Sequence, residues 1–132
     1  MKKGFTMLEV LTCLIIIAAL AGILLPRFTT TTAKTNQRQA ESNLRIIRMA
    51  QKMYYARNGL YACSTACANA VAIQTGLGGS DSINIKDGGT YVYSMTSPTA
   101  TTFTATATGG SATLTVNQDN AWTKGGAAYT PS

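Results

Sequence analysis

The sequence predicts an α+β protein in which one long N-terminal helix packs against a small antiparallel sheet of about 3–4 strands. An apolar run opens the chain, an amphipathic stretch without Gly or Pro follows it, and segments that alternate apolar residues with threonines come last. The 132 residues are enough for one domain with an appendage. We therefore divide the chain into a leader (1–4), an apolar helix (5–25), its amphipathic continuation (26–58) and a globular head (59–132).

The apolar run from residue 5 to residue 25 contains a single charged residue, Glu9. As a helix it would rise about 31 Å, close to the roughly 30 Å hydrocarbon core of a bilayer. Lys2 and Lys3 place its N-terminal side toward the cytoplasm. A removed secretory signal is the alternative, but Pro26 and Arg27 follow the run in place of a cleavage site with small residues. We expect the run to be kept as a membrane-spanning helix.

Glu9 needs a partner, because a charge deep in a bilayer costs about 2.5 to 3.5 kcal/mol on insertion scales. A cut after Gly4 would create a new α-amine on Phe5, about one helical turn from the Glu9 carboxylate. Between staggered subunits the same pair would set the axial register of an assembly. We expect Glu9 and the Phe5 amine to form an assembly charge pair.

The stretch Gly4-Phe5-Thr6-Met7-Leu8-Glu9, followed by a long apolar helix, resembles the class III signal of the type IV pilin superfamily. That superfamily includes pilus subunits, pseudopilins of type II secretion systems and competence pseudopilins. The resemblance implies that a prepilin peptidase cuts after Gly4 and methylates the amine of Phe5, while the helix stays on the protein. Pro26 stands where many members carry a helix-interrupting proline. Because proline lacks an N–H and clashes with the preceding turn, we expect a soft point from Gly22 to Pro26.

The stretch that follows is predicted to be an amphipathic helix. At about 100° per residue, five basic side chains fall within about 20° of one line along it. This basic stripe consists of Arg27, Lys34, Arg38, Arg45 and Lys52. The nearly opposite face is apolar, and we expect it to pack on the sheet. Glu41 is expected to pair with Arg38 or Arg45 at helical spacing. Asn58-Gly59 is expected to end the helix, because Gly readily adopts the left-handed conformation.

The basic stripe has two interpretations. It could contact nucleic-acid phosphates or anionic lipid headgroups. The simpler interpretation is solvation, or pairing with acids of neighbouring subunits, because no aromatic residue is interleaved within the stripe and no recognised DNA-reading motif is present.

The strand signals are concentrated late in the chain. The segments Thr90–Thr96, Thr102–Thr108 and Ala112–Val116 are predicted strands, and Gly109-Gly110 is a hairpin signal between the last two. Ser97–Thr101 is a predicted turn. A further strand is weakly indicated around Ala127–Tyr129.

Cys63 and Cys67 enclose three residues in the sequence CSTAC. An exported domain meets oxidising conditions, which favours a small disulfide loop over two reduced thiols. No cysteine follows Cys67, whereas many pilins carry cysteines that bracket a C-terminal region.

The absence of histidine and the scattering of acids argue against an enzyme, and we expect no cofactor and no metal. The resemblance implies a structural subunit of a type IV pilus-like extracellular filament. Its implied partners are further copies in a homo-oligomeric helical filament, an inner-membrane prepilin peptidase and the pilus assembly machinery. The precursor would be stored in the inner membrane and the filament displayed on the cell surface. The alternatives are a pseudopilin of a type II secretion system and a competence pilin or pseudopilin that captures DNA.

Overall fold

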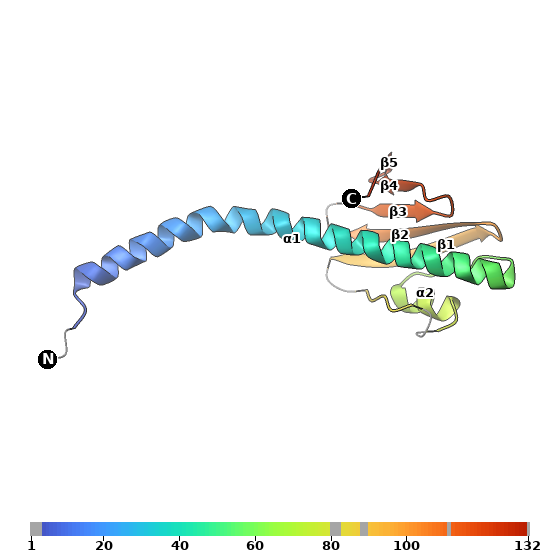
Figure 1. The fold of residues 1–132 in the computed structure, drawn as a ribbon, viewed down its shortest axis with the longest axis horizontal. Helices are drawn as coiled ribbons and strands as arrows, with labels where there is room; N and C mark the ends of the chain where they lie inside the picture. Colours follow the sequence, from blue (N-terminus) through green and yellow to red (C-terminus); the bar gives the residue numbers. More distant parts are fainter. Residues whose placement is uncertain (1–3, 80–82, 88–89, 111, 132) are drawn as a thin grey trace. The chain divides into compact units, whose positions relative to one another are not determined.

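The computed structural model describes residues 4–79, 83–87, 90–110 and 112–131, with only the backbone described for 24–29 and 98. A long helix, α1 (Met7–Asn58), is followed by a short helix, α2 (Ala70–Gly76), and then by five strands (Figure 1). The predicted α+β class, with one long N-terminal helix and an antiparallel sheet, is confirmed.

The chain divides into two compact units, Met1–Thr35 and Asn36–Ser132, and α1 contributes residues to both. In the first unit, α1 begins after Thr6, whose carbonyl oxygen accepts hydrogen bonds from the amides of Glu9 at 3.1 Å and Val10 at 3.3 Å. No helix within the described ranges combines the length and the apolar character that crossing a membrane requires.

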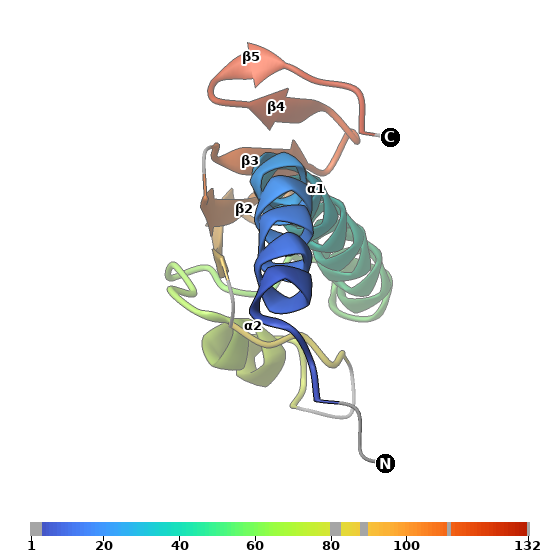
Figure 2. The same ribbon diagram turned by 90° about the vertical axis from the view of Figure 1, so that its left-hand side faces the viewer.

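The second unit contains an antiparallel meander in the order β1-β2-β3-β4-β5. All five strands are labelled in Figure 1, and Figure 2 shows β2 to β5 after a quarter turn. The strands are β1 (Tyr91–Thr99), β2 (Thr102–Gly109), β3 (Leu114–Asn117), β4 (Trp122–Lys124) and β5 (Ala127–Ala128). The sheet therefore has five strands where the sequence predicts three or four. The additional strand is β4, whose three residues are too few to show a period of two.

The predicted turn at Ser97–Thr101 begins too early, because β1 continues to Thr99 and the turn is confined to Ala100 and Thr101. The β1–β2 register shifts between Thr96 and Thr99, around Pro98. Since β1 lies at one end of the sheet, a proline is tolerated there.

The core lies between the inner face of the sheet and the second half of α1. Alternate residues of β2 and β3 are buried, as the predicted alternation requires. From α1, Ala40, Leu44 and Ile47 are fully buried. The strand residues that pack in this core are Tyr91, Tyr93, Met95, Phe103, Ala105, Ala107, Leu114, Val116 and Trp122.

The opposite side of the sheet, which we call the outer face, is rich in hydroxyl groups. In one row across the strands, Ser94 lies opposite Thr106, Thr106 opposite Thr115, and Thr115 opposite Thr123. The hydroxyl oxygens of Thr115 and Thr123 are 2.6 Å apart. Further described positions on this face also lack an ionisable group: Val92, Thr96, Thr102, Thr104, Thr108, Asn117 and Ala128.

Two predicted glycine turns are present. Gly59 has φ +72° and follows the last residue of α1, Asn58. Gly109 has φ +156°, and a Cβ placed there would lie 1.7 Å from the carbonyl oxygen of Thr90, so no other residue fits the β2–β3 hairpin at this position. The helix α2 is not among the predicted elements, although Asn69 caps it by accepting a hydrogen bond from the Ala72 amide at 2.7 Å.

Candidate functional site

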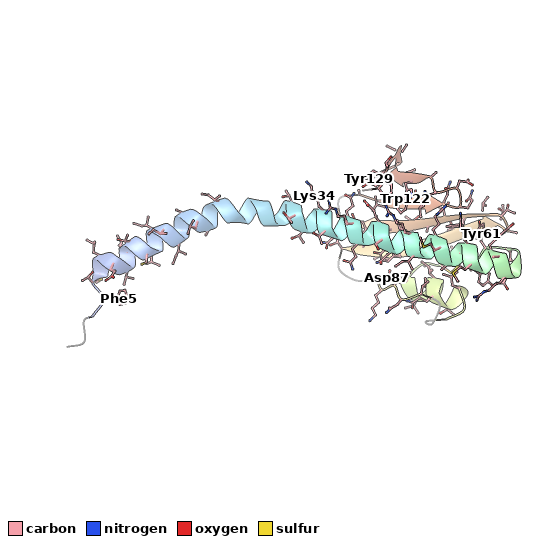
Figure 3. The ribbon with its side chains drawn as sticks, viewed as in Figure 1. Phe5, Lys34, Tyr61, Asp87, Trp122 and Tyr129 are labelled. Atoms are coloured by element: carbon pink, nitrogen blue, oxygen red, sulfur yellow. A yellow bond between two sulfur atoms is a disulfide. The ribbon has the colours of Figure 1, made fainter. Side chains whose placement is uncertain are left out.

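The predicted cleavage site precedes α1, and both of its residues are accessible. Phe5 is 78% exposed, and a Cβ added at Gly4 would meet no atom within 4 Å. Figure 3 shows Phe5 at the start of the helix. This geometry leaves the bond between Gly4 and Phe5 free of packing that would hinder a peptidase.

Glu9 lies in the first turn of α1, where a negative charge interacts favourably with the helix dipole. Its amide also lies 3.4 Å from the hydroxyl oxygen of Thr6. The Glu9 side chain is exposed, and no group among the described residues donates to its carboxylate. Its pairing with the Phe5 amine stays a prediction.

The first half of α1 exposes a continuous set of large apolar side chains. Phe5, Met7, Val10, Leu11 and Leu14 also line a shallow hollow of about 400 Å³. The exposed side chains are Phe5, Met7, Leu8, Val10, Leu11, Leu14, Ile15, Ile16, Ile17, Leu20 and Ile23. An apolar surface of this extent indicates contact with lipid or with other protein chains.

The predicted soft point from Gly22 to Pro26 lies inside α1, whose helical assignment runs without interruption from Met7 to Asn58. A Cβ at Gly22 would meet nothing within 4 Å, so this glycine is not required by packing inside the chain. The soft point stays a prediction.

The basic stripe is exposed wherever its side chains are described. Lys34 belongs to the first unit, and Arg38, Arg45 and Lys52 belong to the second. The Arg27 side chain lies outside the described part of the structure. The guanidinium carbon of Arg45 is 5.9 Å from the ring centroid of Trp122, within the range of a cation–π contact. This aromatic neighbour is not predictable from the helical pattern, because Trp122 comes from β4.

Arg48 lies off the stripe and packs inward. Its Nη2 is 3.5 Å from the carbonyl oxygen of Gln118, and its Nε is buried without a hydrogen-bond partner among the described residues. Among the basic residues of α1 in the second unit, Arg38, Arg45 and Lys52 of the stripe are exposed, as is Arg57 away from it. Arg48 instead contacts the loop after β3.

Glu41 does not pair with Arg38 or Arg45 as expected. Its carboxylate is 2% exposed and accepts hydrogen bonds from the Tyr129 hydroxyl at 2.6 Å and from Gln37 Nε2 at 2.9 Å. Lys124 Nζ donates to Gln37 Oε1 at 2.8 Å. The hydrogen bond to Glu41, followed by desolvation, raises the pKa of Tyr129. This set of four side chains, Gln37, Glu41, Lys124 and Tyr129, is the C-terminal polar network, and it fixes the end of the chain to α1.

The predicted disulfide between Cys63 and Cys67 is present. No cluster of three or more His, Cys, Asp or Glu side chains suited to a metal occurs in the described ranges. The second unit has open surface grooves. One, near the end of α1, is about 440 Å³ and is lined by Met53, Tyr54, Arg57 and Leu77 among others. Another, beside α2, is about 540 Å³ and is lined by Val71, Gln74 and Lys86 among others.

Comparison with known proteins agrees with this architecture. The family described as "Prokaryotic N-terminal methylation motif" matches residues 1–25. The family described as "Type IV minor pilin ComP, DNA uptake sequence receptor" matches residues 26–120.

One curated relative is the "Type IV major pilin protein PilA" of Myxococcus xanthus (strain DK1622). It is 33% identical over 60 residues, which are 46% of this chain and 27% of that protein, so the match spans about a quarter of the relative's length. No solved structure matches the chain. The two family matches adjoin at residues 25 and 26, and α1 runs through that junction. The chain belongs to the type IV pilin family, in the group described as the minor pilin ComP.

Proposed function

We propose that this chain is a structural subunit of a type IV pilus-like filament, assembled from a membrane-stored precursor after cleavage between Gly4 and Phe5. The observation that carries the proposal is that two family matches adjoin, the methylation motif over 1–25 and the minor pilin match over 26–120. In this proposal residues 5–25 hold the precursor in the inner membrane. They later pack against copies of themselves in a helical filament on the cell surface.

The exposed apolar half of α1 supports both stages. Lipid tails and the side chains of a neighbouring helix are similarly apolar, so transfer from the membrane to a filament core need not be costly. Glu9 would be neutralised by a Phe5 amine in the assembly, and that pair would fix the axial stagger of the subunits. Cleavage and methylation would come from a membrane prepilin peptidase. Extraction would come from a separate motor, since the sequence contains no phosphate-binding loop of the Walker type.

Mass analysis of sheared surface filaments tests the proposal directly. The expected N-terminal peptide begins with an N-methylated Phe5. Recovery of filaments that still contain Met1 would overturn the proposed processing. Filaments that never leave the cell envelope would instead favour the secretion pseudopilus, which is the alternative within the same family.

A second candidate function is DNA binding, and a specific observation favours it. The family that matches residues 26–120 is described as a DNA uptake sequence receptor. Arg38, Arg45 and Lys52 lie seven residues apart, so their Cα atoms are spaced by about 10 Å along one side of α1. Because all three are exposed and none forms an ion pair within the described residues, their charges are available to phosphates.

DNA binding can be tested with the full chain in detergent micelles and a duplex at several salt concentrations. The double variant Arg38→Ala/Arg45→Ala should bind more weakly and lower the slope of log K against log salt by about 2. The matched control is Arg57→Ala/Lys86→Ala, which removes the same charge away from the stripe and should retain the slope. Equal losses in both variants, or no binding by the unmodified chain, would discard this candidate.

A further inference from the structure

The segment Tyr61–Cys67, which we call the strap, lies along the free edge of β1. The Tyr61 amide donates to the carbonyl oxygen of Ala100 at 3.1 Å, and the Ser97 hydroxyl donates to the carbonyl oxygen of Ala62 at 2.7 Å. Farther along the edge, Cys67 and Met95 exchange two backbone hydrogen bonds of 2.7 and 2.8 Å. The strap therefore occupies the backbone donor and acceptor of Met95, which an edge strand would otherwise present to solvent.

The strap contains more residues than the strand edge that it covers. The two contacts join Ala62 to Ser97 and Cys67 to Met95. The strap has more residues between these contacts than β1 has, so its extra residues must bulge away from the strand. The bulge begins at Cys63, which has φ +64°, a left-handed conformation that is unfavourable for a residue with a side chain. The disulfide closes the bulge at its base and keeps Cys67 in register with Met95.

The disulfide also lies against α2. A Cβ added at Gly76 would be 2.8 Å from Cys63 Sγ and 3.5 Å from Cys67 Sγ. Cys67 Sγ is 3.3 Å from the carbonyl oxygen of Ala72. Cys67 is buried and Cys63 is only partly so, which makes Cys63 the more exposed of the two cysteines.

We propose that the Cys63–Cys67 disulfide is a redox-sensitive guard of the β1 edge, by which we mean that its reduction exposes the backbone of β1 at Met95. While the bond is intact, it holds the strap over Met95. When a dithiol reduces the bond, Cys63 leaves its strained conformation, the bulge extends, and the Cys67–Met95 hydrogen bonds open. The edge of β1 at Met95 is then open to solvent.

The reduction is a two-electron exchange with a dithiol. One thiolate of the reductant attacks Cys63 Sγ, the bond to Cys67 Sγ breaks, and the Cys67 thiolate that leaves takes up a proton. The second thiolate of the reductant then displaces Cys63, which is also protonated, and the reductant becomes a cyclic disulfide.

Part of the β1 edge is protected by a side chain that lies outside the strap. The Tyr93 amide donates to Asp87 Oδ1 at 2.8 Å, and Figure 3 shows Asp87 beside α2. In the middle of the sheet, Leu114 and Val116 of β3 are paired on both sides. These amides are internal references, because the proposal predicts a change at Met95 and none at Tyr93 or in β3.

Hydrogen exchange of the full chain in detergent micelles, with and without dithiothreitol, tests the guard. We expect reduction to accelerate exchange at the Met95 and Cys67 amides by at least about tenfold, with Tyr93, Leu114 and Val116 changing less than about twofold. Unchanged protection at Met95 in the reduced chain would overturn the proposal. Equal loss of protection at Leu114 and Val116 would also overturn it, because the disulfide would then stabilise the whole head.

Two variants complete the test. Cys63→Ser/Cys67→Ser should show the fast exchange at Met95 without any reductant. Cys13→Ser, which removes the free cysteine of the described chain, should respond to the reductant as the unmodified chain does. If Cys13→Ser abolished the response, the effect would arise from that thiol and the proposal would fail.

Discussion

The Glu41 carboxylate is buried in the head, where it accepts hydrogen bonds from two neutral donors and contacts no cation directly. Removing a donor to a buried charge leaves that charge less compensated. We therefore expect Tyr129→Phe to lower the free energy of unfolding by about 1.5 to 3 kcal/mol.

Fluorescence of Trp122, the single tryptophan, during urea denaturation measures the effect of Tyr129→Phe. Tyr55→Phe is the control, because the Tyr55 hydroxyl has no hydrogen-bond partner among the described residues and its removal should change little. Equal stabilities of the two variants would contradict the role given to the C-terminal polar network.

The tyrosines of the head also predict how stability depends on pH. Burial raises the pKa of Tyr61, Tyr91 and Tyr93, and the hydrogen bond to Glu41 raises that of Tyr129. The folded state then holds these protons more tightly than the unfolded state, so stability is fully present below about pH 10 and falls as pH rises above it. Urea denaturation at about pH 8, 10 and 11 should show the fall, and Tyr129→Phe should make it shallower. A free energy of unfolding that stays constant through about pH 11 would refute the expectation.

At the scale of the element, α2 is fixed by contacts at both of its ends. Asp87 Oδ2 accepts from the Ala70 amide at its start at 2.7 Å, and Gly76 at its end packs on the disulfide. Replacing Gly by Ala inside a helix ordinarily stabilises by about 0.5 to 1 kcal/mol. Here the new methyl group would overlap Cys63 Sγ, and overpacking costs about 1 to 3 kcal/mol.

We therefore expect Gly76→Ala to destabilise the head, by up to about 2 kcal/mol in net terms. The same urea denaturation measures it. Thr75→Ala is the control in the neighbouring exposed position and should be close to neutral. If Gly76→Ala proved stabilising, the contact between α2 and the disulfide would be looser than described.

The elements that could be predicted from sequence are those with local signals. The end of α1 needed only Asn58-Gly59, and the β2–β3 hairpin needed only Gly109-Gly110 between alternating residues. The strand β4 is held mainly by pairing with its neighbours, and its three residues carry no readable period. The two residues of β5 gave only the weak indication around Ala127–Tyr129. The cap of α2 was readable at Asn69, but seven residues are too few for a helical pattern to stand out.

At the scale of the whole molecule, the N-terminal motif was predictable, and the contacts between α1 and the C-terminal segment were not. The motif is contiguous, so Gly4, Phe5 and Glu9 were identified from adjacent letters. The partner of Glu41 is Tyr129, which is 88 positions away, whereas helical spacing pointed to Arg38 and Arg45. Only the folded sheet brings the C-terminal segment to this side of α1.

The proposed charge pair of Glu9 can be tested by its effect on filament assembly. If the Glu9 charge pairs with the Phe5 amine of a neighbour, Glu9→Gln should lower filament yield at least about tenfold, since it keeps the shape of the side chain and removes the charge. Quantification of sheared filaments relative to the cell-bound precursor measures this. Thr12→Ala, a small change one turn away in the same exposed helix, should assemble normally. Normal yield with Glu9→Gln would exclude the charge pair.

The outer face of the sheet bears hydroxyl and methyl groups at Ser94, Thr106, Thr115 and Thr123, and none of its described positions can gain or lose a proton near neutrality. Acidification or a change of ionic strength in the medium thus leaves that side chemically constant. The charged residues of the head lie elsewhere, on α1, at Lys124 of β4 and in the loops that contain Asp87 and Asp119. Any sensitivity of the head to such changes must therefore originate away from the outer face, so two sides of one small domain respond differently to the medium.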